Sequence, residues 1–502
     1  MCKRIKSEVL EITFSLAKNG EKTCKISNAF LHSAYNPVQE ALRFVDSLSY
    51  SFAHLSIIVT EPCLSYCAPF FRKKFPNAKI FAIRYSTFFS DSDSLWDKVF
   101  YISKINLDEE LFNFFGEEVL LSTLFVSWKA SDAIFKNESE YTWNVIRKTV
   151  QKSMDVLFTR SYFAKRWILN SAIFCSNVKK IFTIQKGTSP IVISASGKSL
   201  SGILPLLKKT RESFFLIAAS SSLSVLDANN IKPDLCISTD GGYYAKAHLF
   251  PLFKNFCDVP LAISCESACP KKILQNHPIV PLSYTDGITN ELLDYCKINS
   301  TVAKRNGSVS GTALELALSI TSGDVYLCGL DLFPSSSFQH ARPNLLEEKD
   351  NDFRTKTKES NIMQRRFSSG SLSVYSDWFS AFSNNTERIF RLSNDFQYKN
   401  KFRNIADVNE DFFSKKLIQN KNQSREQNKK PSFVKNKLEE NIRERTKDFF
   451  EKKFSCESWI SEIFPADYLF YKRSLTQEDK QKVMEDIIKK NEDFVKKLRR
   501  YF

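Results

Sequence analysis

The chain has 502 residues, of which 43% are hydrophobic and 44 are Phe. These totals exclude a wholly disordered protein and leave room for about three domains with buried cores. A balance of 72 Lys and Arg against 56 Asp and Glu gives a formal net charge of +16, so we expect a surface that attracts anions. The charge alone does not distinguish nucleic acid, anionic lipid, a sugar nucleotide or an acidic protein as the partner.

The 12 Cys residues are scattered, and their closest spacings are Cys63-x-x-x-Cys67 and Cys265-x-x-x-Cys269. Neither pair has a second pair or a nearby His at zinc-finger spacing, so buried free thiols in a reducing cytosol are expected rather than structural zinc. Acidic residues interrupt the basic N-terminal start, and no run of 18 apolar residues occurs. We therefore expect a cytoplasmic protein with no membrane span.

Residues 1–136 predict a small α/β domain. Apolar and polar residues alternate on both sides of Asn19-Gly20, which indicates a β-hairpin over 9–27. Strands at 55–59 and 78–83 with a helix between them form a degenerate Rossmann-like unit. The turn at 60–66 contains no Gly, whereas a phosphate-binding turn needs Gly where its backbone approaches the ligand. We expect this domain to be a scaffold or to bind a partner.

Residues 137–395 predict a central domain that begins with a helical lead-in. Short apolar strands alternate with helices of ten to fifteen residues, which favours a Rossmann-like, mostly parallel sheet covered on both faces. The expected strands lie at 191–194, 215–219, 235–238, 261–264 and 325–328, with a last helix at 373–382 and a final strand at 389–393.

Residues 396–502 predict a basic, helical C-terminal domain. The stretch 415–437 is rich in Lys, Asn and Gln, and we expect it to be a flexible connection. Helical spacing with many charges at 438–454 and 477–498 indicates helices with solvated faces. The expected fold class is therefore α/β, with a Rossmann-like central domain, a smaller N-terminal α/β domain and a helical C-terminal region.

Four chemical clusters follow strands or begin helices, and ligands of such sheets lie beyond the carboxyl ends of the strands. The first, Ser196-Gly197-Lys198-Ser199, lacks the upstream Gly of a P-loop. It fits better an anion site of backbone N–H groups and Ser hydroxyls. In the second, Asp240-Gly241-Gly242, the carboxylate can accept sugar hydroxyls or hold a divalent ion, and a simple turn is the alternative.

The third cluster, Ser308-Val-Ser-Gly-Thr, begins a helix. Ser310 or Thr312 either caps this helix or holds a phosphate together with the backbone N–H groups. The fourth, Gly329-Leu-Asp331, brings another strand-end carboxylate. His340, one of 5 His, lies on a polar loop, where it can be a general acid or base, bind a phosphate, or merely be exposed.

The order of these motifs resembles the motility accessory factor (Maf) flagellin glycosyltransferases over residues 1–395. The resemblance implies transfer of a nonulosonic acid, of the pseudaminic or legionaminic type, from its CMP-activated form to Ser or Thr of flagellin, in support of filament assembly and motility. The segments that carry it are 32–41, 193–200, 231–240 and 307–317, with Gly329-Leu-Asp-Leu and His340-Ala.

The central domain of that family is similar to bacterial sialyltransferases. This likeness implies that Ser310 and Gly311 contact the nucleotide and that 196–199 form the other wall of the cleft. The family's usual Gly-Pro-Ser-Leu reads Gly197-Lys-Ser-Leu here, and Phe333 replaces a tyrosine. We predict nucleotide-sugar contacts by Ser196, Gly197, Lys198, Ser199, Gly241, Ser310, Gly311 and Thr312, and base or sugar contacts by Asp240, Asp331 and His340.

Flagellin and a CMP-nonulosonic acid are thus the expected partners, with no nucleic acid and no metal-ligand set. A requirement for a divalent metal and the oligomeric state are left open. One alternative is a pterin pyrophosphokinase of the MptE type, which would need further carboxylates for magnesium near Asp240, where Gly241 and Gly242 stand. The other alternative is a non-catalytic flagellin-binding or chaperone-like protein.

Overall fold

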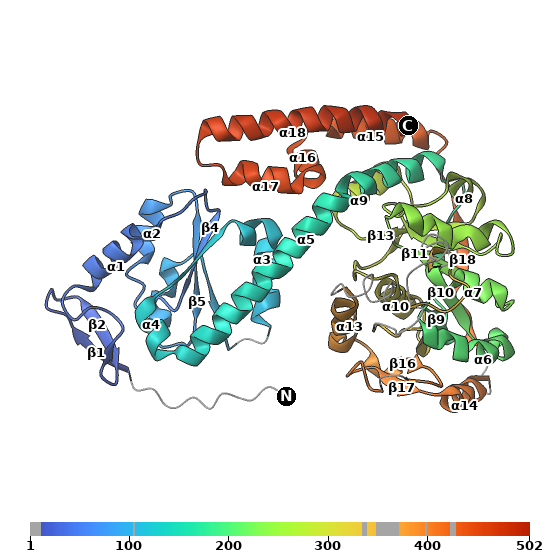
Figure 1. Cartoon of the computed structure of the whole chain (residues 1–502), viewed down its shortest axis with the longest axis horizontal. Helices are drawn as coiled ribbons and strands as arrows, with labels where there is room; N and C mark the ends of the chain where they lie inside the picture. Colours follow the sequence, from blue (N-terminus) through green and yellow to red (C-terminus); the bar gives the residue numbers. More distant parts are fainter. Residues whose placement is uncertain (1–11, 104–105, 334–338, 348–370, 397–398, 422–427) are drawn as a thin grey trace, which may run out of the picture. The chain divides into compact units, whose positions relative to one another are not determined.

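A computed structural model describes residues 12–103, 106–333, 339–347, 371–396, 399–421 and 428–502 (Figure 1). The chain divides into two compact units, to both of which the long helix α5 (Lys136–Asn177) contributes. Unit 1 consists of Met1–Tyr162 and Ile460–Glu492, and unit 2 consists of Phe163–Trp459 and Asp493–Phe502. The division into three domains stays a prediction.

Unit 1 begins with the predicted hairpin. Strands β1 (Ile12–Leu16) and β2 (Lys22–Ile26) pair antiparallel, and β3 (Ala29–Phe30) extends the sheet beside β2. Gly20 has a φ of +84°, a left-handed conformation that glycine adopts without steric cost. The Asn-Gly signal therefore located the turn correctly.

The main sheet of unit 1 is parallel, with strand order β6-β5-β4-β7. Every residue of β4 is buried, which is typical of a central strand covered on both faces. The order of the strands reverses between β4 and β7. The elements are α1 (Pro37–Asp46), β4 (Ser56–Thr60), α2 (Ala68–Lys74), β5 (Lys79–Arg84), β6 (Lys98–Tyr101), α3 (Leu107–Leu121), β7 (Thr123–Ser127) and α4 (Lys129–Ile134).

Unit 2 is built on an 11-stranded sheet with the order β17-β16-β15-β9-β10-β11-β12-β13-β8-β18, in which β14 also pairs with β13. All its pairs are parallel except that of β18 with β8. The strands are β8 (Ile181–Gln185), β9 (Ile191–Ser194), β10 (Phe215–Ala219), β11 (Leu235–Ser238), β12 (Leu261–Ser264), β13 (Ile279–Ser283), β14 (Thr301–Val302), β15 (Val325–Cys328), β16 (Ile389–Leu392), β17 (Ala406–Val408) and β18 (Ser432–Asn436).

Helices cover both faces of this sheet (Figure 1). On one face, side chains that include Ile191 and Ile193 pack against α10 (Val309–Ile320) and α13 (Ser371–Ala381). The opposite face carries α6 (Leu204–Lys209), α7 (Leu223–Ala228) and α14 (Glu410–Lys421). Further helices are α8 (Lys271–Asn276) and α9 (Gly287–Tyr295). The predicted α/β fold class with a mostly parallel central sheet is confirmed.

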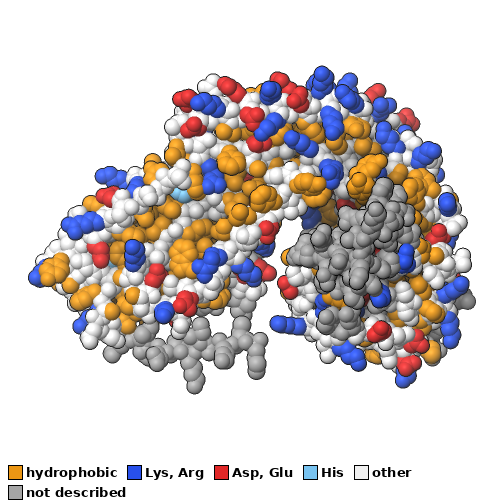
Figure 2. Space-filling model, in the orientation of Figure 1, with side chains coloured by type: hydrophobic (Ala, Val, Ile, Leu, Met, Phe, Trp, Pro, Cys, Tyr) orange, Lys and Arg blue, Asp and Glu red, His pale blue; other side chains and the backbone are white. Residues whose placement is uncertain are grey.

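The C-terminal region is helical, as predicted. Its helices are α15 (Ile442–Lys453), α16 (Glu457–Ile463), α17 (Pro465–Arg473) and α18 (Gln477–Leu498). Figure 2 shows many Lys and Arg side chains, with Asp and Glu among them, over α15 and α18. Across the described residues, no helix combines the length and apolar character needed to span a bilayer.

Two predictions about the later chain were wrong. Strand β16 is not the final strand, because β17 and β18 follow it in the same sheet. The stretch 415–437 is not simply a flexible connection, since it includes part of α14 and the whole of β18. Strand β18 forms an edge of the sheet and pairs on one side only. Its sequence Ser-Phe-Val-Lys-Asn has two apolar residues among five, so its composition gives little strand signal.

Candidate functional site

The strand order of unit 2 reverses between β9 and β15, and in open α/β sheets ligands bind at such a reversal. Here the two post-strand turns touch. The Ala195 N–H donates to the Cys328 carbonyl at 2.8 Å, and the Gly197 N–H donates to the Gly329 carbonyl at 2.8 Å. Gly329 has a φ of +66°, and a Cβ added to it would lie 2.5 Å from the Ala195 carbonyl oxygen. Glycine is therefore required at this contact.

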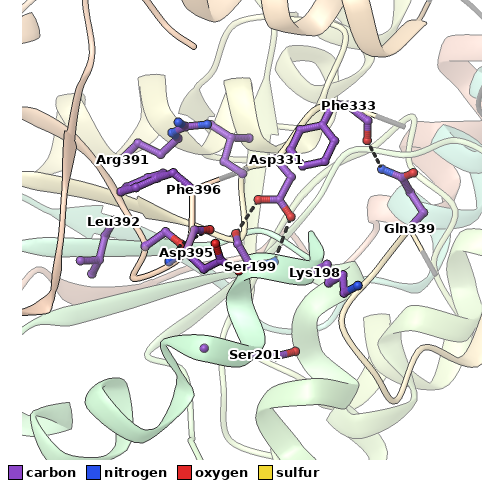
Figure 3. A pocket seen from close by; sticks show the side chains of 13 residues that line it. Lys198, Ser199, Ser201, Asp331, Phe333, Gln339, Arg391, Leu392, Asp395 and Phe396 are labelled. Carbon is purple, nitrogen blue, oxygen red and sulfur yellow. Dashed lines mark hydrogen bonds between the residues drawn. The ribbon is translucent and has the colours of Figure 1, made fainter. Parts of the chain in front are cut away.

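Asp331 joins the two turns. Its Oδ2 accepts the Ser199 N–H at 2.9 Å, and its Oδ1 accepts the Ser199 hydroxyl at 2.5 Å (Figure 3). A Cβ added to Gly197 would lie 2.5 Å from Asp331 Oδ2. The carboxylate thus fixes the start of the short 3-10 helix η2 (Lys198–Gly202). The Ser199 N–H was predicted to bind an anion of the ligand, but in the structure it donates to the carboxylate of Asp331.

A cavity of about 380 Å³ lies beside this contact. Its volume falls at the lower end of the range of small-molecule sites, about 300–1,000 Å³. Figure 3 shows Arg391 and Phe396 on one side of Asp331 and Lys198 and Gln339 on the other. The cavity is lined by Lys198, Ser199, Ser201, Gly202, Leu330, Asp331, Phe333, Gln339, Arg391, Leu392, Ser393, Asp395 and Phe396.

Strand β16 supplies the part of this cavity that the sequence did not predict. Arg391 is buried and bonds Asp407 through two hydrogen bonds of 2.7 Å, while its guanidinium lies 4.8 Å from the centre of the Phe396 ring. Lys401 donates to the Leu332 carbonyl at 2.5 Å. Burial and the neighbouring Arg391 lower the pKa of Lys401 to about 8, although Asp331 opposes this. The sequence did hold one signal for this part of the site, namely a charged residue, Arg391, inside the otherwise apolar strand Ile-Phe-Arg-Leu.

His340 lies against the β9 turn. Its backbone forms an antiparallel bridge with Gly197, and the Ala341 N–H donates to the Ser196 carbonyl at 2.8 Å. The Ser196 hydroxyl accepts the Ser221 hydroxyl at 2.9 Å, so Ser196 holds the turn. The structure therefore brings 196–199, Asp331 and His340 together at one edge of the sheet, as the strand order predicts.

Of the predicted residues, Lys198, Ser199 and Asp331 line the cavity. Ser196, Gly197 and His340 adjoin lining residues without belonging to the lining themselves, and the other predicted residues lie outside it. Asp240 Oδ1 accepts the Gly242 N–H at 2.7 Å, the geometry of a simple Asx turn. Gly241 packs on Trp167, because an added Cβ would lie 2.8 Å from the indole ring. Tyr375 faces this turn, and its pKa is raised first by burial and then by Asp240.

Helix α10 is capped by Ser308 rather than by Ser310 or Thr312. The Ser308 side chain accepts the Gly311 N–H at 3.1 Å. The Thr312 hydroxyl is buried and donates to the Lys304 carbonyl at 3.0 Å. Contact of Ser310, Gly311 and Thr312 with a nucleotide accordingly stays a prediction.

The sequence also missed an ion pair at the ends of β12 and β13. Arg305 bonds the buried Glu266 through two hydrogen bonds of 2.6 Å and lies 4.2 Å from the centre of the Tyr284 ring. Its guanidinium also reaches Asp286 at 3.2 Å. Two carboxylates neutralise this cation, so it is not a strong anion site. Among the described residues no group of three or more His, Cys, Asp or Glu side chains is placed to hold a metal ion.

The equivalent reversal in unit 1 is filled by protein. The buried Arg84 donates to Glu61 Oε1 at 3.0 Å, to the Cys63 carbonyl at 2.7 Å and to the Ser65 hydroxyl at 2.9 Å. Glu61, Cys63 and Ser65 all have positive φ, so the turn is left-handed at three residues without any glycine. Burial raises the pKa of Glu61, although Arg84 opposes this.

His32 fills the space between the ends of β4 and β7. Its Nε2 accepts the Leu64 N–H at 3.0 Å, and its ring centre lies 5.0 Å from that of Trp128. Burial, and then the Arg84 charge, lower the pKa of His32 to about 3, so the ring is neutral. These side chains occupy the crevice of unit 1, and its role as a scaffold or partner-binding domain stays a prediction.

Comparison with known proteins gives a relative. An uncharacterized protein of Treponema pallidum (strain Nichols) is 31% identical to this chain over 314 residues, which are 62% of this chain and 70% of that protein. The chain belongs to the family of that protein. Residues 165–335 match the model of a family described as 6-hydroxymethylpterin diphosphokinase MptE-like, and these residues include β9 and β15.

The whole fold is similar to a solved structure of a Maf glycosyltransferase from Magnetospirillum magneticum AMB-1. The TM-score is 0.51 with 12% identity, and the match covers 99% of this chain and 93% of that chain. At this identity the likeness concerns the fold. It agrees with the expected architecture from the N-terminal α/β region to the C-terminal helices.

Proposed function

We propose that this chain is a glycosyltransferase that moves a nonulosonic acid from a CMP-activated donor to Ser or Thr of flagellin. The observation that carries the proposal is the cavity at the reversal of strand order in unit 2, where Lys198 offers positive charge and Phe333 and Phe396 offer aromatic surface, whereas Asp407 neutralises Arg391. Cations suit the donor's phosphate and carboxylate, and aromatic rings suit its base. The similarity of the fold to a Maf glycosyltransferase supports the same reaction class.

In the proposed reaction the acceptor oxygen attacks the anomeric carbon of the donor. A C–O bond forms there while the C–O bond to the phosphate breaks, and CMP leaves with the electron pair. His340 takes the proton of the acceptor hydroxyl, and Lys198 offsets the charge that develops on the phosphate. Asp331 acts by holding the β9 turn through Ser199. Contacts of Asp240 and of 310–312 with the donor belong to the same proposal.

The test is direct. Purified protein is incubated with flagellin and a CMP-activated nonulosonic acid, and the mass of intact flagellin is measured. We expect a mass increase equal to one or more sugar residues, and CMP binding by calorimetry. Phe396→Ala should lower the affinity for CMP by about tenfold, since stacking on a base contributes about 1–3 kcal/mol. Phe250, which is 51% exposed on another segment, gives the matched control Phe250→Ala. The proposal is refuted if the mass of flagellin does not increase and CMP does not bind.

The match of 165–335 to the MptE-like family favours a second candidate, a diphosphokinase. This activity transfers a diphosphate from ATP to a hydroxymethylpterin and releases AMP. An assay with ATP, 6-hydroxymethylpterin and magnesium would then yield AMP that depends on the pterin. Formation of AMP without any change in the mass of flagellin would replace the first proposal by the second.

A further inference from the structure

A buried carboxylate meets the proposed base of the reaction. His340 Nδ1 lies 2.6 Å from Glu347 Oε1, and the Glu347 side chain is 2% exposed whereas that of His340 is 28% exposed. The second carboxylate oxygen, Glu347 Oε2, is buried and accepts no hydrogen bond from any residue that the structure describes. Burying a carboxylate with one oxygen unpaired is unfavourable for folding. This pair is therefore poorly explained as a stabilising contact.

The backbone holds both members of the pair in place. The bridge between His340 and Gly197 attaches the His340 backbone to the β9 turn. The Glu347 N–H donates to the side chain of Asn344, which is itself buried, at 3.3 Å. The ring is thus fixed at the edge of the sheet that carries the cavity, next to Gln339, which lines it. A group that must accept a proton from a bound hydroxyl needs this kind of fixed placement.

We propose that Glu347 is a positioning residue that prepares His340 to act as the general base. A carboxylate at Nδ1 places the ring proton on Nδ1 and the lone pair on Nε2. When the acceptor hydroxyl reacts, its O–H bond breaks and an Nε2–H bond forms, while the oxygen's electron pair makes the bond to the anomeric carbon. Glu347 then stabilises the imidazolium. The proton transfer from the acceptor hydroxyl rests on the proposed function. The position of the proton on the His340 ring does not depend on it.

The state of the ring can be measured without any substrate. The chain has only 5 His, so long-range ¹H–¹⁵N spectra of the full-length protein are simple, and His340→Gln assigns the signals. We expect His340 to carry its proton on Nδ1 in the wild type. In Glu347→Leu, which removes the acceptor, the proton should move mainly to Nε2. A wild-type ring protonated mainly on Nε2 would overturn the inference.

Kinetics give the second readout. Glu347→Leu and Glu347→Gln should lower kcat on the order of 10²-fold with little change in KM, and the double variant with His340→Gln should be no slower than His340→Gln alone. Because no described residue donates a hydrogen bond to Glu347 Oε2, Glu347→Leu should leave the melting temperature unchanged or higher. A structural role would instead lower the melting temperature and reduce kcat only in proportion to the unfolded fraction.

The control is Asp234, a partly buried carboxylate beside the same sheet. Asp234 pairs with Arg211 at 2.8 Å and accepts the Leu216 N–H at 2.7 Å, at the opposite edge of the sheet. Asp234→Asn should leave kcat unchanged. If the wild type transfers sugar and the Glu347 variants keep full kcat, the inference fails and the proposed function stands. If the wild type transfers no sugar, the proposed function fails, and the ring spectra still decide whether Glu347 sets the proton.

Discussion

Each of the two parallel sheets of this chain has a crevice where its strand order reverses, and different side chains line the two crevices. In unit 1 the strand order reverses between β4 and β7, and in unit 2 it reverses between β9 and β15. The turn after β4 closes around the cation Arg84, and His32 fills the remaining space. The turn after β9 closes around the carboxylate of Asp331 and leaves a cavity of about 380 Å³ beside it.

This difference shows that the strand order determines where a crevice forms, whereas the side chains determine whether it is filled. A reversal of strand order brings loop ends together in both units, but only side chains decide whether the space is filled. In unit 1 a buried ion pair and a neutral imidazole make the crevice part of the core. In unit 2 two glycines bring the turns into contact without filling the neighbouring space.

Arg84→Leu should give the largest effect on stability. It leaves Glu61, which is completely buried, without its cation, and breaking a buried pair in this way costs about 3–5 kcal/mol. We expect urea unfolding, followed by hydrogen exchange of β4 and β5, to show a loss of this size in unit 1. CMP binding measured below the transition should be unchanged.

The matched control removes both charges. Arg84→Leu combined with Glu61→Leu should recover part of the lost free energy of unfolding, because Glu61 is no longer an uncompensated buried charge. The recovery should be incomplete, since Asp93, which pairs with Arg84 at 3.0 Å and is 24% exposed, still loses its cation. If the single variant costs less than about 1 kcal/mol, the network does not hold the left-handed turn. A loss of CMP binding in the folded single variant would break the proposed separation of roles between the two crevices.

Gly197→Ala tests the contact of the two turns in unit 2. Its Cβ would lie 2.5 Å from both Asp331 Oδ2 and the Gly329 carbonyl oxygen, so one of the turns must shift. We expect a loss of about 1–3 kcal/mol in the free energy of unfolding, together with weaker CMP binding. Gly202→Ala is the control, because no heavy atom lies within 4 Å of its added Cβ. Its stability should be unchanged or higher by about 0.4–1 kcal/mol. Equal effects of both variants would contradict the contact.

The sequence predicts the central strands of both sheets because each is a short apolar run. Strands β4 and β9 are buried at every position, so nothing dilutes their signal. The same reasoning placed 196–199 and Asp331 at one edge, since parallel strands share their carboxyl ends. The edge strand β18 was missed for the opposite reason, because only two of its five residues are apolar.

The partners of the charged groups could not be predicted. Nothing local in the sequence says that Asp331 binds Ser199 across 132 residues, or that Arg391 enters the cavity from a strand expected to be ordinary core. The same holds for Glu266 with Arg305, which are 39 residues apart. Spacing identifies candidate residues, whereas the bonds that occupy them depend on tertiary packing.

His32→Gln tests the filled crevice through pH. The native pKa of His32 is lowered from 6.5 to about 3, so below pH 6.5 the unfolded chain takes up a proton that the native state does not. Stability present above pH 6.5 is therefore lost as the pH falls towards 3, at up to about 1.4 kcal/mol per pH unit. Gln keeps an acceptor for the Leu64 N–H but does not titrate.

Urea unfolding of both proteins at about pH 7 and about pH 5 measures this difference. Relative to the wild type, the variant should gain stability as the pH falls, whatever its stability at neutral pH. Since the same carboxylates titrate in both proteins, their contributions cancel in the difference. Parallel curves would mean that His32 is not held neutral in the native state.

Lys198→Met should give the smallest effect, and it tests the open crevice. Lys198 is exposed at the cavity, and an exposed charge contributes about 0.2–1 kcal/mol, so CMP affinity should fall by no more than about fivefold. The remaining affinity should depend less on salt, because a screened attraction has been removed. Lys208→Met, an exposed change in the last turn of α6, should alter neither quantity. A loss of CMP affinity far above fivefold would mean that Lys198 contacts the phosphate in a desolvated site. The unit 2 crevice would then enclose its ligand as fully as the unit 1 crevice encloses Arg84.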